Sequence, residues 1–514
     1  MARNPSGRGG AGGEPRDPFQ TAYMLARDFL RGLSSRHVGS RAPIVELRRE
    51  LGGPLPEDGR PAAGVIDALA AGVDPGLVAS AGPRYFGFVT GGSLPAAVAA
   101  DWLTTAWDQN GALVATSPAA AVVEEIAAEW ILELTGLPKT ASVGLVTGCQ
   151  MANFTGLAAA RHAVLARAGW NMAERGLRGA PPVRIVVGAE AHVTIHAALR
   201  MLGFGTEEIV TVDADDQGRM RTDALEAAIR DAGPPLIVCA QAGNVNTGAF
   251  DPLGAIIDLA HARGAWVHVD AAFGLWAAAA PARRHLTSGI ERADSWASDG
   301  HKWLNVPYDC GIAIVADPEA HRAAMTSAAS YLERREGDLR DPLDWVPESS
   351  RRARAFVVYA ALRSIGRRGF ADLVERCCRY AALMADLLRA DPHVEILNDV
   401  VLNQVLVRFH ASADPATRAG WPEHVEGPRP APIPRHARDG LSTSKASAQL
   451  ADDLTRAAVE RVQRDGVCWA GGTVWHGLAA MRISVCNWST AEDDIRESAA
   501  AILQAAGSVR DNAL

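Results

Sequence analysis

Residues 265–272 read Ala-Trp-Val-His-Val-Asp-Ala-Ala, an apolar run that ends in the carboxylate of Asp270. A run rich in β-branched and aromatic residues predicts a short buried strand. An acidic side chain directly after such a strand lies at the edge where open α/β sheets bind their ligands. We therefore expect Asp270 to face a ligand, because an ordinary surface-loop aspartate would not follow so apolar a run.

Similar short runs recur on both sides of this segment, and helical patterns separate them. The alternation predicts an α/β domain built on a mostly parallel sheet. The expected strands are 183–187, 209–212, 236–240, 265–269 and 311–315, and the helices between them include 222–232 and 252–263. Longer helices are expected over 119–135 and 350–389, and C-terminal strands near 401–409 and 480–485.

The composition limits the class of protein. The chain has 514 residues, a formal net charge of −8, 48% hydrophobic and 21% charged residues, which is typical of a folded protein of two or three domains. The mild acidic excess favours neither nucleic acid nor a membrane surface as a partner. The seven cysteines show no paired spacing, the N-terminus shows no signal-peptide pattern, and the chain has no apolar run of roughly 20 residues. Together these observations predict a cytoplasmic location.

Shifts in composition along the chain predict its domain organisation. We expect a disordered tail over 1–17, a helical arm over 18–101, a large domain over 102–365 and a small C-terminal domain over 366–514. Within the last region, a stretch rich in Pro, Gly and Arg over 412–447 predicts a flexible surface insertion.

Only three lysines occur in the chain, so any lysine chemistry comes from Lys139, Lys302 or Lys445. Lys139 follows a helix stop and Lys445 lies in the insertion, which predicts solvated side chains for both. Lys302 precedes Trp303 and Leu304, and apolar neighbours predict a desolvated amine with a lowered pKa that attacks carbonyl groups. Taken alone, a merely structural, partly buried lysine is the commoner alternative.

Asp270 changes that balance because an amine and an acid together are the two groups that pyridoxal phosphate requires. The amine binds the aldehyde, and the acid keeps the ring nitrogen protonated. Residues 144–153, Gly-Leu-Val-Thr-Gly-Cys-Gln-Met-Ala-Asn, form a strand-like run, a glycine turn and a helix start, which suits a phosphate group. Alone, this last signal is weak.

His192 and His196 lie four residues apart. A zinc pair on one helix face is one interpretation, but the glutamate of the HExxH pattern is missing, so we predict no metal. The alternatives are a core histidine at 196 and, at 192, an imidazole stacked on a cofactor ring.

Taken together, these motifs resemble the pyridoxal-phosphate-dependent group II amino-acid decarboxylases, which include aromatic-amino-acid and glutamate decarboxylases. The similarity runs from about Pro83 to Ala500. The fold that it implies is fold type I of the pyridoxal-phosphate enzymes, an α/β fold with a seven-stranded, mostly parallel sheet in the large domain and a small C-terminal α+β domain. The family works as an intertwined homodimer with its active sites at the interface.

The resemblance also implies residue roles. Lys302 would form the Schiff base and Asp270 would pair with the ring nitrogen, while His192 and Ala272 would lie on opposite ring faces. The phosphate-binding positions would be those of Cys149, Gln150, Asp299 and His301. The implied reaction is decarboxylation of an L-amino acid to the amine through an external aldimine and a quinonoid.

Two departures from the family pattern leave alternatives open. Asn244-Val245 stands where family members carry two threonines, so a hydroxyl group is lost unless Asn244 or Asn246 replaces it. The stretch 333–345 lacks the tyrosine that protonates the carbanion in the aromatic branch, so His192 or Tyr331 would have to supply the proton. The alternatives are decarboxylative oxidative deamination to an aldehyde, another reaction at Cα or, from a different class, a catalytically silent scaffold.

For the substrate pocket, aromatic side chains upstream are plausible walls, and core packing is their equally common alternative. The candidates are Tyr85, Phe86, Phe88 and Trp107. Asn110 and Ala112 stand where the aromatic branch has large apolar residues, which hints at a more polar pocket. The residues alone do not identify the amino acid.

Overall fold

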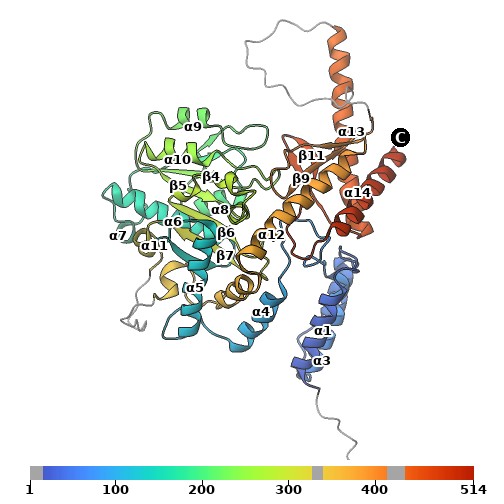
Figure 1. The fold of residues 1–514 in the computed structure, drawn as a ribbon, viewed down its shortest axis with the longest axis horizontal. Coiled ribbons are helices and arrows are strands. Elements are labelled where there is room, and N and C mark those ends of the chain that lie inside the picture. Colours follow the sequence, from blue (N-terminus) through green and yellow to red (C-terminus); the bar gives the residue numbers. More distant parts are fainter. Residues whose placement is uncertain (1–15, 327–339, 414–434, 514) are drawn as a thin grey trace, which may run out of the picture.

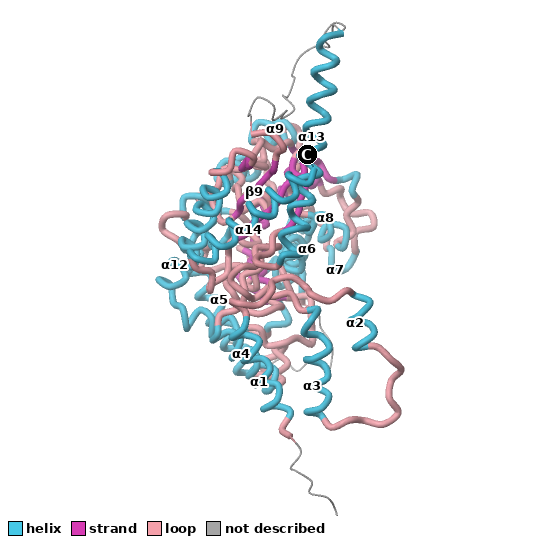
Figure 2. Tube along the Cα trace, turned by 90° about the vertical axis from the view of Figure 1, so that its right-hand side faces the viewer, coloured by secondary structure: helices cyan, strands magenta, loops and turns pink. Residues whose placement is uncertain are grey.

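The computed structural model describes residues 16–326, 340–413 and 435–513. A large α/β domain occupies one side of the molecule, and a smaller sheet with long helices occupies the other (Figure 1). The N-terminal helices project as a separate arm, which stands clear of both sheets when the molecule is turned (Figure 2).

The large domain is built on a seven-stranded, mostly parallel sheet with the order β1-β7-β6-β5-β4-β2-β3, as expected for fold type I. Only β7 runs antiparallel to its two neighbours. The strands are β1 (Ser142–Val146), β2 (Arg184–Gly188), β3 (Ile209–Val212), β4 (Leu236–Gln241), β5 (Trp266–Asp270), β6 (Ser295–Asp299) and β7 (Gly311–Val315). The five predicted strands are present to within one residue at each end.

Strand β6 was not predicted as a strand, because three of its five residues are polar. Ser295, Ser298 and Asp299 are nevertheless buried, and their side chains find hydrogen-bond partners on neighbouring segments. Hydrogen-bond partners from elsewhere in the fold satisfy these buried polar groups, so β6 does not need the apolar pattern that usually marks a central strand.

Alternate side chains of the strands pack on two different helical layers. Val186, Val238 and Val267 face one layer, whereas Ile185, Ile237 and Trp266 face the other. The first layer contains α5 (Pro118–Thr135), α9 (Thr222–Ile229), α10 (Leu253–His261) and α12 (Ala355–Arg389). The second contains α6 (Cys149–Arg167), α8 (Val193–Met201) and α11 (Pro318–Met325), with the short helix α7 (Met172–Arg175) beside them.

The small domain is a four-stranded antiparallel sheet with the order β10-β11-β9-β8, packed against long helices. Its elements are β8 (Val394–Ile396), β9 (Gln404–Phe409), α13 (Arg435–Asp465), β10 (Gly471–Trp475), β11 (Leu478–Ser484) and α14 (Glu492–Ala513). Of the stretch 412–447, expected to be a flexible surface insertion, residues 435–447 form the first turns of α13. Residues 414–434 lie outside the described residues.

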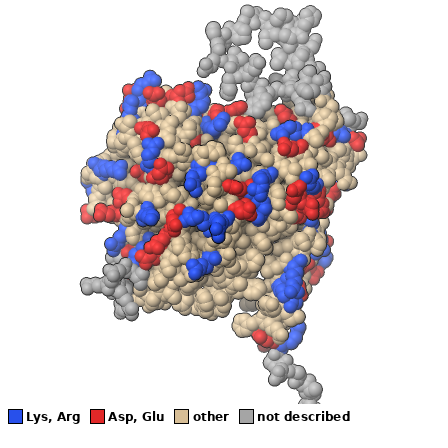
Figure 3. Space-filling model, viewed as in Figure 1, with Lys and Arg blue, Asp and Glu red and all other residues tan. Residues whose placement is uncertain are grey.

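The arm consists of α1 (Pro18–Gly32), α2 (Ile44–Leu51) and α3 (Ala62–Val73), and α4 (Pro95–Trp107) follows it. The arm leaves many apolar side chains in solvent, and Phe19, Ile44 and Val45 are more than two-thirds exposed. Acidic and basic side chains are intermixed on the face shown in Figure 3. Within the part of the chain that the structure describes, no helix combines the length and apolarity needed to span a bilayer.

Candidate active site

The segment that carries Lys302 lies between β6 and β7 and is fixed by buried neighbours. Asn305 donates to the carbonyl groups of Trp303 and Cys486, at 2.8 and 3.0 Å, and so ties the segment to the small domain. Gly91 packs against the Lys302 carbonyl so closely that a Cβ at position 91 would lie 1.7 Å from that oxygen. The backbone on both sides of Lys302 is therefore held in place before any ligand binds.

The amine of Lys302 is largely sequestered, with 19% of the side chain exposed, whereas Lys139 is exposed as expected. The Lys445 side chain lies outside the described side chains. Burial, the largest single effect, lowers the pKa of Lys302. The acidic groups around the amine, led by the carboxylate of Asp299, whose Oδ2 lies 3.0 Å from Nζ, together outweigh burial and leave that pKa raised. The predicted lowering is therefore wrong: the counter-charge stabilises the ammonium form.

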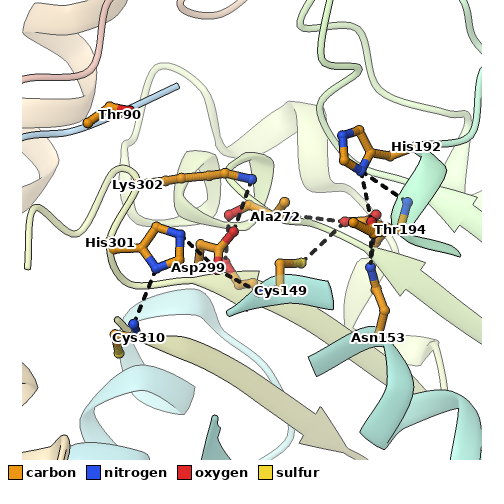
Figure 4. A network of polar contacts seen from close by, with 12 residues as sticks. Thr90, Cys149, Asn153, His192, Thr194, Ala272, Asp299, His301, Lys302 and Cys310 are labelled. Carbon is orange, nitrogen blue, oxygen red and sulfur yellow. Dashed lines mark hydrogen bonds and ion pairs between the residues drawn. The ribbon is translucent and has the colours of Figure 1, made fainter. Parts of the chain in front are cut away.

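Lys302 opens into a cavity of about 320 Å³ at the carboxyl ends of the central parallel strands. This volume is within the usual range for small-molecule sites. Figure 4 shows Lys302, His192, Ala272 and Cys149 around it. The lining residues, which we call the site cavity, are Phe88, Gly148, Cys149, Gln150, His192, Thr194, Gln241, Gly243, Val245, Asp270, Ala272, Phe273, Asp299, His301, Lys302 and Tyr308.

Asp270 ends β5 and is held by three hydrogen-bond donors. The backbone N–H of Ala272 donates to Oδ1 at 3.2 Å, and Asn153 Nδ2 donates to Oδ2 at 3.2 Å. The thiol of Cys149 donates to Oδ1 at 3.6 Å, and burial raises the pKa of that thiol, so it keeps its proton. Three donors thus hold both oxygens of this buried carboxylate in place.

The N-terminus of α6 forms the opposite end of the site cavity. Gly148 caps this helix, and the first amide of the helix, on Cys149, donates to Asp299 Oδ1 at 2.6 Å. Gln150 is exposed beside it, and His301 lies close by with Nε2 3.4 Å from the same Asp299 oxygen. The amide of Gln150 and the His301 imidazole are donors suited to a phosphate group. The first amide of the helix already bonds Asp299, and those of Met151 and Ala152 bond the Gly148 carbonyl.

His192 caps the N-terminus of α8, and its hydrogen bonds fix its tautomer. The Thr194 hydroxyl lies 2.8 Å from Nδ1, and the Thr194 backbone N–H donates to Nδ1 at 3.4 Å. Burial lowers the pKa of His192, so the ring is neutral near pH 7, and with Nδ1 accepting, its hydrogen sits on Nε2. Among the described residues, no group of three His, Cys, Asp or Glu side chains is arranged to hold a metal ion.

The predicted aromatic and polar walls of the substrate pocket separate into two groups. Phe88 lines the site cavity and is 62% exposed, whereas Phe86, Trp107 and Asn110 do not line it within one chain. Phe86 packs in the core, Trp107 packs edge-on against Phe356 at the surface, and Asn110 accepts from the Arg351 backbone. The backbone is left-handed at Phe88 and Val89, and in this turn Phe88 is exposed whereas Phe86 and Val89 are buried.

Three side chains that the sequence motifs did not single out reach the site. Gln241 and Tyr308 line the cavity. Gln241 lies opposite Asp270 in the sheet register, and the Tyr308 ring stacks on that of His301 with 4.3 Å between the ring centroids. Arg482 is close enough to influence the pKa of His192, and burial lowers its own pKa. Only the Arg482 position had a signal, because it falls in the C-terminal strand expected near 480–485.

Neither asparagine that could replace the missing hydroxyl lines the site cavity. Asn244 Oδ1 accepts the backbone N–H groups of Asn246 and Thr247, and Asn244 Nδ2 donates to Gln241 Oε1 at 3.2 Å. Asn246 Oδ1 accepts from the Thr473 hydroxyl. The polar group beside Asp270 at this edge is instead the carboxamide of Gln241.

This donor set fits a pyridine aldehyde phosphate. One cavity is lined by a sequestered amine, by a carboxylate that accepts three hydrogen bonds and by the N-terminus of a helix. His192 adds an imidazole to this lining, and Ala272 adds a methyl group. Each group matches one part of pyridoxal phosphate: the aldehyde, the ring nitrogen, the phosphate and the two ring faces.

Comparison with known proteins leads to the same chemistry. Residues 46–411 match the pyridoxal-dependent decarboxylase conserved domain. Tryptophan decarboxylase 1 of Oryza sativa subsp. japonica is 27% identical over 503 residues, which cover 94% of this chain and 92% of the rice protein. Phenylacetaldehyde synthase of a Rosa hybrid cultivar is 28% identical, covering 75% and 77% of the two chains.

The solved structures agree with the sequence relatives. The crystal structure of Oryza sativa TDC with PLP and tryptamine superposes with a TM-score of 0.84 at 25% identity, covering 96% of this chain and 97% of the other.

Proposed function

This chain belongs to the pyridoxal-dependent decarboxylase family, and on that premise we propose that it removes the α-carboxylate of an L-amino acid as CO₂ and releases the amine. The observation that carries the proposal is the meeting of Lys302, Asp270 and His192 in one cavity. Pyridoxal phosphate bound there supplies an electron sink for the bond that breaks.

Lys302 is the residue that we assign to cofactor attachment, and Asp270 is the electrostatic element. Three donors hold this carboxylate in place, and a carboxylate beside a pyridine nitrogen favours the protonated ring. Cys149, Gln150 and His301 are assigned to the phosphate, with Asp299 shared between this end and Lys302. Ala272 and His192 are assigned to the two ring faces.

Arg482 is our candidate for binding the substrate carboxylate. Its guanidinium donates to the Val245 carbonyl at 3.4 Å, and it makes no ion pair within the described parts of the chain. A half-buried cation beside the cavity is a suitable partner for an anionic substrate group.

The carbon that loses CO₂ needs a proton, and His192 and Tyr308 are our two candidates for its donor. Neutral His192 presents Nε2–H and acts as a hydrogen-bond donor more readily than as an acid. Tyr308 carries a hydroxyl 3.4 Å from Thr90 Oγ1. Tyr331 lies outside the described residues.

The second candidate function is decarboxylative oxidative deamination. It is favoured by the absence of tyrosine from 333–345 and by the similarity to a protein named phenylacetaldehyde synthase. In that reaction the amino acid, O₂ and water give the aldehyde, CO₂, ammonia and H₂O₂. Without an efficient proton donor, the carbanion survives long enough to reduce O₂.

A panel of amino acids distinguishes the two reactions when all products are measured. Decarboxylation gives amine and CO₂ in equal amounts with no O₂ consumed, whereas the oxidative reaction gives aldehyde, ammonia and H₂O₂. The Lys302→Ala variant serves as the inactive control. A protein that binds the cofactor but converts no amino acid would refute both functions and favour the catalytically silent scaffold.

We also propose a cytoplasmic homodimer. The arm exposes Ile44 and Val45, and α4 exposes Trp102, Leu103 and Trp107, so a second copy would bury apolar surface that one chain leaves in water. The part of the surface near α4 and α5 carries few charged side chains in Figure 3. Seven unpaired thiols match a reducing compartment.

A further inference from the structure

A row of buried polar side chains lies beneath the site cavity. Trp266, His268 and Asp270 occupy alternate positions of β5, so they share one face of the strand, and that face is covered by α6. Ser295 on β6 and Asn153 on α6 complete the row. The side chains of Trp266, His268, Ser295 and Asn153 are completely buried.

The orientation of Asn153 follows from its charged neighbour. Its carboxamide lies 3.2 Å from Asp270 Oδ2 on one side and 2.9 Å from His268 Nε2 on the other. An oxygen facing the Asp270 carboxylate would be repelled, so the NH₂ group of Asn153 must face Asp270. Its oxygen then faces His268 and accepts from Nε2.

This orientation makes every hydrogen bond of the row point toward Asp270. Burial lowers the pKa of His268 to about 4, so the ring is neutral, and with its hydrogen on Nε2, its Nδ1 accepts from the Ser295 hydroxyl at 2.8 Å. The Ser295 oxygen in turn accepts the indole N–H of Trp266 at 2.9 Å. The direction of donation is also fixed at the Trp266 end of the row, because an indole N–H can only donate.

Asn153 is also a branch point. Its NH₂ group donates to Thr194 Oγ1 at 3.3 Å, and the Thr194 hydroxyl donates to His192 Nδ1 at 2.8 Å. In Figure 4, dashed lines lead from Asn153 upward and from His192 to Thr194. One carboxamide thus serves the acid at the end of β5 and, through Thr194, the imidazole at the start of α8.

We propose that Asn153, oriented by His268, is a positioning residue that holds the carboxylate of Asp270 in place for the cofactor ring nitrogen and, through Thr194, supports the His192 ring. This inference rests on the proposed function and extends it to residues that touch neither substrate nor cofactor. The donor row replaces water around a buried carboxylate, and such charge-assisted bonds are the strong class of hydrogen bond.

The packing around His268 supports a dedicated place for this ring. Gly156 on α6 faces it, and a Cβ at position 156 would lie 2.8 Å from His268 Cε1 and 2.9 Å from Nδ1. A side chain at 156 would push the imidazole away from Asn153 and Ser295.

The test compares Asn153→Asp, His268→Leu and His268→Gln with the wild-type holoenzyme. Asn153→Asp keeps the size but removes both donors, His268→Leu removes the orienting N–H, and His268→Gln restores an N–H donor. The readouts are the dissociation constant of pyridoxal phosphate and the ¹⁵N resonance of ring-labelled cofactor, which distinguishes a protonated from an unprotonated ring nitrogen. Val269→Ala, a buried neighbour that faces the other layer, controls for lost packing.

We expect Asn153→Asp and His268→Leu to weaken cofactor binding about tenfold or more and to diminish the protonated ring-nitrogen signal, because one charge-assisted bond contributes at least that factor. His268→Gln and Val269→Ala should keep the wild-type resonance. The proposal is overturned if His268→Leu keeps that resonance, or if Val269→Ala loses it equally. A wild-type protein that binds no pyridoxal phosphate would instead contradict the proposed function itself.

Discussion

Asp299 Oδ2 lies 3.0 Å from Lys302 Nζ, and the other oxygen of the same carboxylate accepts the first amide of α6. One acid therefore connects the attachment lysine to the phosphate end of the site. It is also the leading one of the groups that together reverse the direction in which burial alone would move the pKa of Lys302.

Replacing Asp299 by Asn should lower the pKa of Lys302, because burial continues to disfavour the ammonium after the counter-charge is removed. Only the free amine attacks an aldehyde. The apoenzyme variant should therefore capture pyridoxal phosphate at a lower pH than the wild type, as measured by the rate at which the visible absorbance forms. Asp317→Asn, at the cap of α11, is the control, and an unchanged or higher pH midpoint for Asp299→Asn would contradict the role of this ion pair.

Lys302→Ala should abolish turnover together with the covalent adduct between protein and cofactor that borohydride traps. Mass spectrometry of the trapped peptide checks this directly. Lys139→Ala, which alters an exposed lysine, should behave as the wild type. Turnover retained by Lys302→Ala would refute the assignment.

Asp270→Ala should reduce the decarboxylation rate by about 10²–10³-fold or more, the usual effect of losing a preorganised electrostatic group. The loss should appear in kcat, with a smaller change in KM, because the charge acts when the substrate bond breaks. Steady-state kinetics of the cofactor-saturated variant measures it. A near-wild-type rate would remove Asp270 from the mechanism.

His321 should make the protein sensitive to acid. Its ring is completely buried, and burial lowers its pKa from 6.5 to about 3. Because the unfolded chain binds the proton first as pH falls, the stability that this residue contributes is present above pH 6.5 and is lost between pH 6.5 and about 3. The loss is on the order of 3–5 kcal/mol.

Thermal midpoints measured from neutral to acidic pH check this prediction. His321→Gln should flatten the pH dependence, whereas His285→Gln, at an exposed position, should leave it unchanged. Equal slopes for the wild type and His321→Gln would show that other groups control acid unfolding.

Ile44 and Val45 should lie in the dimer interface, since each is 71% exposed in the single chain. The double variant Ile44→Asp, Val45→Asp should shift the protein toward monomer in light scattering coupled to size exclusion. Met201→Asp, an exposed apolar position on α8, is the matched control. A dimer of undiminished stability in the double variant would place the interface elsewhere.

The sequence predicted elements where the apolar pattern is continuous and missed them where burial is polar. Strands β2, β4 and β5 are built around apolar residues such as Ile185, Ile237 and Val267, and they were located to within a residue. In β6, Ser295 and Ser298 are buried with hydrogen-bond partners from Trp266 on β5 and from Ala272 in the segment that follows β5, and no local pattern reveals such partners.

The same distinction applies to the site residues, because the local sequence indicates some of their roles whereas others depend on the fold. Lys302 and Asp270 have local contexts that indicate their chemistry, and the fold brings both to one cavity. The raised pKa of Lys302 depends on how closely Asp299 approaches Nζ, which spacing along the chain does not determine. Arg482 reaches the site only because the small domain packs against the large one.

The contact between Gly91 and the Lys302 carbonyl has a practical consequence for enzyme engineering. Libraries built to broaden the accepted amino acids would naturally randomise the mouth of the site around Phe88. Position 91 should stay glycine in them, since any larger residue would displace the very backbone that presents the reactive nitrogen. Diversity is better directed to Phe88 and Tyr308, whose rings already extend into solvent.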